Sequence, residues 1–453
     1  MLLAVALACG RPDPDPPPAT PSLQASCASD PEDPTRATCQ VALDAPGHAE
    51  VELTDGTETV RFTTDAPGRA HAIPIWGLHA DRAWSWVARA GPDSASGAFT
   101  PGSLPDALAV EVAATGGSGS TLRGVIGPID CGGGGFATVL DGRGRVRWYA
   151  DTHRDDLDMV QFTEASTVLL VADKAAVIEL DLLGNVWLNR DDYGLPVHHD
   201  VFRRGDAIYT LLADAYPEAN GETYVEEIVV KLDLGGNEIW RWDEHDHLDA
   251  TRARPGGGEF WAWRFPGATD AWHTNALYPT DDEHVLLSLK RESSILRIAE
   301  ADGSIAWTLA GDGVGRSLGS DFAFAGSGDP TFGDEHHVAL VPGGNLTVFD
   351  NRKARGLALS LDETAGTASF VADWPLDLVC GIQSSIFPMG DGHWLATCAP
   401  GHEIAEFDDN GAEVLRLALA CPAGPPITRT ARGQPIDLWG GHSAGGVTAT
   451  RIR

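Results

Sequence analysis

Six segments of the chain share one local plan: an apolar strand, a tight turn rich in aspartate and glycine, and a returning strand that often ends in an aromatic residue. The six copies begin at Leu140, Leu180, Leu232, Ala301, Leu361 and Phe407. Each is typical of a β-hairpin, because Asp and Gly are the residues that tight turns prefer. The copies recur about every 40 to 60 residues, a spacing typical of four-stranded blades around an axis. The pattern predicts an all-β fold with a six-bladed β-propeller over residues 121–453.

A second all-β unit is predicted before the propeller. Between about residues 36 and 100, short alternating strands are separated by turn residues at the intervals expected of a small sandwich. We assign residues 24–120 to this N-terminal β-sandwich. The 52 glycines and 29 prolines also favour a turn-rich β protein over a helical one. In the propeller, we expect a strand from the C-terminal tail to pair with the first blade and close the ring.

The charge of the chain excludes one class of partner. The formal net charge is −33, so the surface has no basic patch for phosphates, and we expect no nucleic-acid partner. No window of the sequence approaches the roughly twenty apolar residues of a membrane span. The 43% hydrophobic content is enough for a large core.

The first residues resemble an export signal. Residues 1–9 form an apolar run that ends in small residues and Cys9, as in a bacterial lipoprotein signal, which makes Cys9 the candidate for lipidation. Residues 10–23 form a Pro-rich linker. We therefore expect an exported protein of the periplasm, the outer membrane or the cell surface, with membrane attachment through the lipidated N-terminus only.

The remaining six cysteines suit an exported compartment, where disulfides persist. Cys27 and Cys39 are close enough in sequence to form a disulfide in the first domain. The pairing of the other four stays open at this point: Cys131, Cys380, Cys398 and Cys421.

Three stretches of the predicted propeller begin with histidine and run into a turn and then an apolar strand. They start at His198, His273 and His336, and the first and third are doublets with His199 and His337. Equivalent positions of a repeat come together in space, so three imidazoles are predicted to converge at one end of the central channel. We choose the first member of each doublet because the distance to the following turn is then six residues in all three copies, and because strand alternation lets only one member face the channel.

Arg291 follows the strand after His273 and is a candidate partner for this cluster. The guanidinium group presents several N–H donors that match two oxygens of a tetrahedral anion. Histidine can act near neutral pH as nucleophile, as proton donor and as proton acceptor. The sequence contains no Ser-His-Asp order, phosphate loop or dinucleotide motif. Covalent chemistry on a histidine, with arginine holding an anionic group, is the hypothesis that uses all of these residues.

The same region resembles bacterial arylsulfate sulfotransferases. The resemblance covers roughly residues 120–440, and the N-terminal sandwich also matches that family's layout. It is carried by Trp272-His273-Thr-Asn275-Ala-Leu, by Phe349-Asp-Asn351 after the His336 strand, and by Ser293-Ser-Ile-Leu-Arg-Ile followed by Gly303-Ser-Ile-Ala-Trp-Thr-Leu-Ala-Gly. In that family a six-bladed propeller moves a sulfuryl group from a phenyl sulfate to a phenol. The transfer proceeds through a sulfated histidine, without a nucleotide donor or other cofactor.

The resemblance implies a role for each site residue. His336 resembles the nucleophile, His273 and Arg291 the residues that bind the sulfuryl oxygens and assist departure of the phenol, and His198 the remaining channel histidine. Contacts to the substrate are expected from four more side chains: Trp272, Asn275, His199 and His337. The partners implied are a phenolic sulfate donor and a phenol acceptor, both small molecules.

Two alternatives remain open from the sequence. The segment Asp243-Glu-His245-Asp-His247-Leu-Asp249 carries oxygen and nitrogen ligands for a divalent cation, so a metal-dependent propeller hydrolase is one alternative. A surface-anchored propeller that serves only as a binding platform is the other, since fold alone does not decide function.

Overall fold

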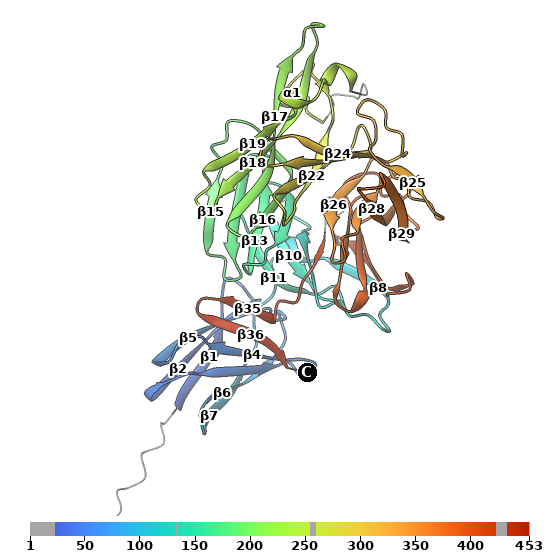
Figure 1. Cartoon of the computed structure of the whole chain (residues 1–453). Coiled ribbons are helices and arrows are strands. Elements are labelled where there is room, and N and C mark those ends of the chain that lie inside the picture. The colour runs from blue at the N-terminus through green and yellow to red at the C-terminus, as the bar shows by residue number, and fades with distance from the viewer. Residues whose placement is uncertain (1–22, 133–134, 254–259, 423–432, 453) are drawn as a thin grey trace, which may run out of the picture.

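The computed structural model describes residues 23–132, 135–253, 260–422 and 433–452. The fold is all-β, as predicted, and the described residues include only short helices (Figure 1). The helical bounds are η1 (Asp106–Leu108), α1 (Glu244–His247), η2 (Ala250–Arg252) and η3 (Gly390–Gly392). Cys9 and the predicted linker lie almost entirely outside the described residues. No described helix has the length and apolar character needed to cross a membrane.

Six antiparallel sheets follow one another along the chain from residue 125 to residue 420. The first three contain β9 (Val125–Pro128), β10 (Phe136–Leu140) and β11 (Val146–Asp151); β12 (Leu157–Phe162), β13 (Thr167–Ala172), β14 (Ala176–Asp181) and β15 (Val186–Arg190); and β16 (Val197–Arg204), β17 (Ala207–Pro217), β18 (Thr223–Asp233) and β19 (Glu238–Asp243), with β20 (Thr269–Asp270) parallel to β18.

The next three contain β21 (Thr274–Pro279), β22 (His284–Leu289), β23 (Ser294–Ala299) and β24 (Ile305–Ala310); β26 (His336–Leu340), β27 (Leu346–Asp350), β28 (Arg355–Asp362) and β29 (Thr367–Pro375), with β25 (Ala323–Ala325) parallel to β29; and β30 (Ser385–Pro388), β31 (Trp394–Cys398), β32 (Glu403–Phe407) and β33 (Glu413–Ala420).

The repeated hairpins of the sequence join the last two strands in the chain order of each of these sheets, leaving aside β20 and β34. Their turn chemistry explains the repeat. The side chain of Asp181 accepts hydrogen bonds from the backbone N–H groups of Leu183 and Asn185, both at 2.9 Å, and Gly184 between them has φ +80°. Asp141 and Asp408 make the same kind of turn in the first and sixth sheets. The aspartate satisfies turn amides and the glycine takes a left-handed conformation that other residues avoid.

The first strands of successive sheets lie next to one another, from β9 through β12, β16, β21 and β26 to β30. The C-terminal part of the chain returns to the first of them, because β34 (Gln434–Pro435) pairs with β9. The Gln434 side chain also accepts a hydrogen bond from Phe162 N at 2.7 Å and donates one to Phe162 O at 3.1 Å. The predicted pairing between the C-terminal tail and the first sheet is therefore present, and it ties the first and second sheets together.

Two further sheets form the N-terminal part of the molecule. One contains β1 (Leu23–Ser29), β2 (Arg36–Gly47) and β5 (Gly68–Trp76). The other contains β3 (Glu50–Thr54), β4 (Thr59–Thr64), β6 (Trp84–Ala90) and β7 (Asp93–Phe99), extended at the β4 edge by β35 (Gly440–Ala444) and β36 (Val447–Ile452). Residues of both sheets share one buried core.

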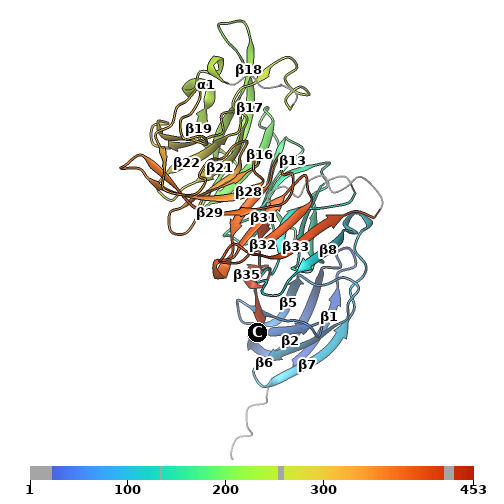
Figure 2. The same cartoon turned by 90° about the vertical axis from the view of Figure 1, so that its right-hand side faces the viewer.

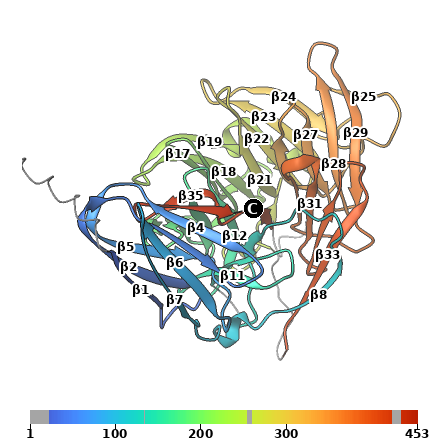
Figure 3. The ribbon, with the colours of Figure 1, turned by 90° about the horizontal axis from the view of Figure 1, so that it is seen from below.

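Strand pairing crosses the predicted boundary at residues 120/121 in both directions. The C-terminal strand β36 pairs with β4 of the N-terminal part (Figure 1), and Figure 3 shows the red β35 of the same hairpin next to the blue N-terminal strands. Conversely, β8 (Glu111–Gly116) pairs with β33 at the outer edge of the sixth sheet, where the two strands lie side by side in Figure 2. The N-terminal part thus includes a strand from the C-terminal end of the chain, and the sixth sheet includes a strand that precedes residue 121.

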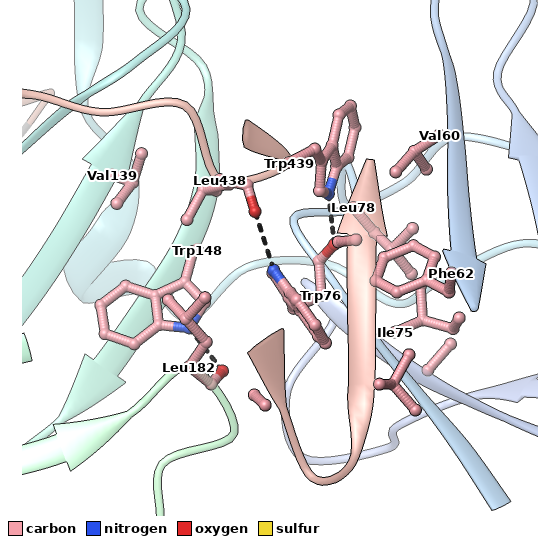
Figure 4. Packing of buried hydrophobic residues seen from close by; sticks show 14 of the residues in the cluster. Val60, Phe62, Ile75, Trp76, Leu78, Val139, Trp148, Leu182, Leu438 and Trp439 are labelled. Atoms are coloured by element: carbon pink, nitrogen blue, oxygen red, sulfur yellow. Dashed lines mark hydrogen bonds between the residues drawn. The ribbon is translucent and has the colours of Figure 1, made fainter. Parts of the chain in front are cut away.

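Tryptophans join the N-terminal part to the first and second of the six sheets (Figure 4). Trp76 Nε1 donates to Leu438 O at 3.0 Å, and Trp439 Nε1 donates to Trp76 O at 2.9 Å. Trp148 Nε1 donates to Leu182 O at 2.8 Å. Each indole is buried in one hydrophobic core that spans both parts, and each N–H has an acceptor, as a buried Trp requires.

Three disulfides hold the described chain. The pairing expected of Cys27 and Cys39 is present, across β1 and β2. The four cysteines whose pairing the sequence left open form Cys131–Cys421 and Cys380–Cys398. The first of these joins the loop after β9 to the segment after β33, and so links the first sheet to the sixth. Three disulfides are consistent with an exported protein.

Candidate active site

The histidine-led strands β16, β21 and β26 each carry an irregularity near their N-terminal ends. The register of pairing shifts between His198 and Val201, between Thr274 and Ala276, and between His336 and Ala339. One histidine in each copy takes positive φ: His199 at 55°, His273 at 54° and His337 at 53°. Such bulges re-aim side chains, and histidine is among the residues that tolerate this conformation best.

The irregularities bring histidines of three sheets together. The ring centre of His199 lies 5.1 Å from that of His273 and 6.4 Å from that of His336. His198 lies behind His199, with the two Nδ1 atoms 2.6 Å apart, so that one ring donates to the other. We call His198, His199, His273 and His336 the histidine cluster. The sequence prediction that imidazoles from three sheets converge agrees with this geometry.

Within the first doublet, the structure places the second member next to the other histidines. His199 contacts His273, whereas His198 is fully buried and packs edge-on against Trp261 at 4.7 Å. The choice of His198 on six-residue spacing assumed regular alternation along the strand. The bulge in β16 breaks that alternation and turns His199 into the cluster.

His337 is not brought to the cluster face of its strand. Its ring packs on Phe387 at 4.1 Å, and it lines a cavity of about 260 Å³ whose walls include Phe202, Tyr278 and Phe387. In the second doublet the first member, His336, is the one whose ring lies near His199, which is the member that the spacing argument chose.

The orientation of His336 is fixed by hydrogen bonds at Nδ1. Asn351 Oδ1 lies 2.7 Å from this nitrogen, and the carbonyl oxygen of Asp334 lies 3.2 Å from it. Asn351 Nδ2 donates to the carbonyl oxygens of Cys380 and Gln383, which fixes its amide with the oxygen toward the imidazole. Both groups at Nδ1 are acceptors, so in the neutral ring the proton is on Nδ1 and the lone pair is on Nε2.

A carboxylate connects His273 to Arg291. Asp270 Oδ2 lies 2.6 Å from His273 Nδ1 and accepts a hydrogen bond from Arg291 Nη2 at 3.1 Å. Burial raises the pKa of Asp270, but His273 and Arg291 outweigh it and hold the pKa below its usual value. Asp270 is therefore ionised, and the proton on Nδ1 of His273 points to it. Sequence reasoning placed Arg291 only loosely and missed Asp270, which lies three residues before His273.

Burial and basic groups shape the electrostatics of the cluster. Burial, reinforced by His273 and opposed by weaker contacts, lowers the pKa of His198 to about 3, so this ring is neutral at physiological pH. Lys290 is next to Arg291, and burial followed by the Arg291 charge lowers its pKa. Lys174 Nζ lies 5.4 Å from the ring centre of Phe260, which itself packs on the cluster. A chain with a strongly negative net charge thus places cations around its histidines, as an anionic ligand requires.

Comparison with known proteins agrees with this chemistry. A model of the family described as Arylsulfotransferase (ASST) matches residues 132–378, which is more than half of the chain and contains all four cluster histidines. The chain belongs to the arylsulfotransferase family. Membership indicates arylsulfotransferase activity in general, on small phenolic substrates.

Other comparisons are less informative. No curated protein sequence matches the chain. Among solved structures, the Cps50 (Swd1) β-propeller domain of Myceliophteria thermophila is 13% identical and covers 77% of this chain and 97% of that one, with a TM-score of 0.39. A streptogramin B lyase is 10% identical and covers 68% and 98% respectively, also with a TM-score of 0.39. These similarities are too weak to carry an argument about this arylsulfotransferase.

Two of the residues predicted to contact substrate, Trp272 and Asn275, are buried in this arylsulfotransferase. Trp272 is fully buried in the core shared by the third and fourth sheets, so its ring is not available to stack on a phenyl group. Asn275 is also buried, and its Nδ2 donates to Glu335 O of the next sheet at 2.8 Å. Both predictions followed from proximity to His273 in sequence; the Trp272 ring lies in the core, and a substrate contact by Asn275 stays a prediction.

An aromatic residue that the sequence analysis missed lies against the histidines. The ring centre of Phe260 is 5.0 Å from those of His199 and His273. Phe260 is only partly buried. The sequence signal was the aromatic run Phe260-Trp-Ala-Trp263 after a glycine-rich segment.

Most residues of the acidic segment 243–249 do not belong to a group with metal-ligand spacing. Asp243 caps helix α1, Asp249 caps η2, and His247 stacks on Trp242. His245 alone joins such a group, with Glu218 and Glu226 from β17–β18. Among the described residues, neither group with metal-ligand spacing includes a cluster histidine.

Proposed function

We propose that this arylsulfotransferase moves a sulfuryl group from a phenolic sulfate ester to a phenol, through a sulfohistidine formed on His336. The observation that carries the proposal is the hydrogen bonding of Asn351, which puts the lone pair of neutral His336 on Nε2. On the far side of His199 lies His273 with its ionised partner, Asp270. A nucleophile and a proton donor are thus oriented separately, as general acid and nucleophilic catalysis require.

In the first step, Nε2 of His336 attacks the sulfur of the donor. The N–S bond forms as the bond between sulfur and the aryl oxygen breaks, and its electron pair leaves with the phenolate. His273 Nε2 supplies the proton that this phenolate takes up, and Asp270 stabilises the resulting imidazole with its proton on Nδ1. Arg291, held by Asp270, donates to the sulfuryl oxygens as their charge develops.

In the second step the roles reverse. His273 takes the proton of the acceptor phenol, whose oxygen attacks sulfur as the N–S bond breaks and its electron pair returns to His336. His199 lies between the two histidines and is placed to bond a sulfuryl oxygen in both steps. Ping-pong kinetics follow, because the first phenol leaves before the second reacts.

We further interpret the six sheets as the blades of one propeller and the two N-terminal sheets as a sandwich. The sequence of contacts from β9 to β30 supports this arrangement, with the first strands innermost. The cluster then lies at one end of the central channel. Phe260, at the same position, is the ring that would stack on the aryl group of either substrate.

A chromogenic phenyl sulfate tests the proposal. Purified protein should release the chromogenic phenol in proportion to an added acceptor phenol, and intact mass after exposure to donor alone should show one added sulfuryl group, lost in His336→Ala. Release that does not require the acceptor would show hydrolysis instead. No release from any phenyl sulfate would contradict the proposal and favour a binding platform.

A further inference from the structure

The hairpin of β17 and β18 extends beyond its neighbours and carries a second polar group. Both strands have 11 residues, whereas β16 has 8 and β19 has 6, and the extension lies at the top of Figure 1 beside α1. Glu218 is in the turn region of this hairpin, Glu226 is on β18, and His245 is on α1. One ligand atom of each lies within 4.8 Å of the others.

The spacing of these atoms suits a small divalent cation. His245 Nδ1 lies 3.1 Å from Glu226 Oε1 and 3.4 Å from Glu218 Oε1. In a tetrahedral site with bonds of about 2.0–2.2 Å, two ligand atoms are about 3.4 Å apart. The imidazole nitrogen is therefore already separated from each carboxylate oxygen by close to the edge length that a shared ion would impose, and the two oxygens lie within 4.8 Å of one another.

Burial of one ligand gives an independent argument. Glu226 is fully buried, and its Oε2 makes no hydrogen bond of normal geometry among the described residues, with only a weaker contact from the Trp272 side chain to the carboxylate. In the part of the chain that the structure describes, no arginine or lysine forms an ion pair with Glu218 or Glu226. His245 is the one cation-capable partner of these two carboxylates among the described residues, and a buried carboxylate that shares a single titratable partner is costly unless an ion adds positive charge.

In the other group with metal-ligand spacing, by contrast, arginines pair with the carboxylates. Asp55, Glu58 and His79 lie together between the two parts of the molecule. Arg82 pairs with Asp55, and Arg147 and Arg451 pair with Glu58. That group is neutralised by the protein itself and needs no ion.

We propose that Glu218, Glu226 and His245 bind a divalent transition-metal ion of the zinc type, through His245 Nδ1 and one oxygen of each carboxylate, with water completing the coordination. An imidazole with two carboxylates suits zinc, whereas calcium takes six or more oxygens and magnesium keeps most of its waters. Glu226 follows Val225, whose backbone pairs with Asp270. The ion would therefore fix the end of β18 against α1, next to the short strand β20, whose Asp270 contacts His273 and Arg291.

Calorimetry with ZnCl₂ on metal-stripped protein tests this proposal independently of any sulfuryl transfer. Wild type should bind one ion that His245→Gln and Glu218→Gln weaken by at least about tenfold, the loss that even an outer-shell change produces. Both residues are partly exposed, so these variants are expected to fold. His247→Gln is the matched control: His247 lies two residues beyond His245 in the same short helix and stacks on Trp242, and the variant should bind as wild type does.

Binding should also strengthen from pH 6 to pH 8, because the metal displaces a proton from His245. Equal binding in wild type and His245→Gln would overturn the site, as would the same loss in His247→Gln. Calcium binding as tight as zinc binding would overturn the choice of metal class.

Discussion

Replacing Asp270 by asparagine isolates the charge that joins His273 to Arg291. The change keeps the shape of a side chain that is fully buried. The carboxylate oxygen Oδ2 accepts from two cation-capable donors, at 2.6 Å and 3.1 Å. Both donors reach this same oxygen, so an asparagine amide oxygen in its place can still accept from both, but it carries no charge. Both hydrogen bonds therefore lose their anionic acceptor, and each is weakened.

A hydrogen bond to a charged group contributes about 1.5–3 kcal/mol, which corresponds to about 10- to 150-fold in rate when it acts on the transition state. We expect kcat/KM of Asp270→Asn for phenyl sulfate transfer to fall by this factor for one bond, and by on the order of 10³-fold if both bonds fail. The loss should be larger for donors whose phenol is a poor leaving group, because these depend most on proton donation by His273.

The assay is initial-rate release of a series of phenols of increasing pKa from their sulfate esters, at a fixed acceptor concentration. Asp282→Asn is the matched control, since this more exposed aspartate pairs with Arg297 away from the cluster. Thermal melting of both variants shows whether either change unfolds the protein. A kcat/KM within twofold of wild type, or a loss that is the same for every leaving group, would refute the role given to Asp270.

Other perturbations test the surroundings of the cluster. The folded pKa of His198, about 3, lies below its ordinary 6.5, so its contribution to stability is complete above pH 6.5 and is lost as the pH falls toward 3. From these values the free energy of unfolding should fall by about 2 kcal/mol at pH 5 because of His198. Urea unfolding at pH 7.5 and at pH 5 should show that His198→Gln reduces the difference in unfolding free energy between the two pH values by about this amount. The same difference in the variant as in wild type would contradict this role of His198. Asn351→Leu should slow formation of the sulfuryl adduct on His336, seen by quenched-flow mass analysis, because Nδ1 loses its acceptor; wild-type adduct kinetics would show that Asn351 does not set the tautomer. Replacing Cys131 and Cys421 together by serine opens a loop of 290 residues, for which the chain-entropy relation gives a loss of about 5–6 kcal/mol in stability, against about 3 kcal/mol for the 18-residue loop closed by Cys380–Cys398. Calorimetric melting should therefore show a larger drop in melting temperature for the Cys131/Cys421 variant than for the variant without Cys380–Cys398. A smaller drop would refute the relation for this protein.

Local chemistry explains why the strands were predictable. The Asp and Gly residues of the repeated hairpins form turns by themselves, as Asp181 and Gly184 do, so six copies of a short pattern were enough to predict an all-β fold. Repetition also predicted that His273 and His336 lie near each other, because equivalent strands of neighbouring sheets are adjacent.

The parts of the site that sequence did not predict depend on non-local packing. Asp270 reaches His273 through β20, a two-residue strand that is ordered by pairing with β18 and has no pattern of its own. The preference for His199 over His198 is decided by a bulge, and a bulge is set by how the whole sheet closes. Trp272 is an aromatic residue next to His273 and was therefore predicted to contact the substrate. It lies instead in a core that forms only when two sheets pack together.

The exchange of β8 and the β35–β36 hairpin between the two parts has a practical consequence for anyone who wants to dissect this enzyme. A fragment starting at residue 121 would lack the outermost strand of its last sheet and would carry a C-terminal hairpin with nothing to dock on. A fragment ending at residue 120 would expose the β4 edge of its sheet and would leave β8 without its partner strand β33. No single cut yields two self-sufficient pieces, so dissection calls for grafting β35–β36 directly onto the N-terminal part and retaining residues 111–116 with the rest.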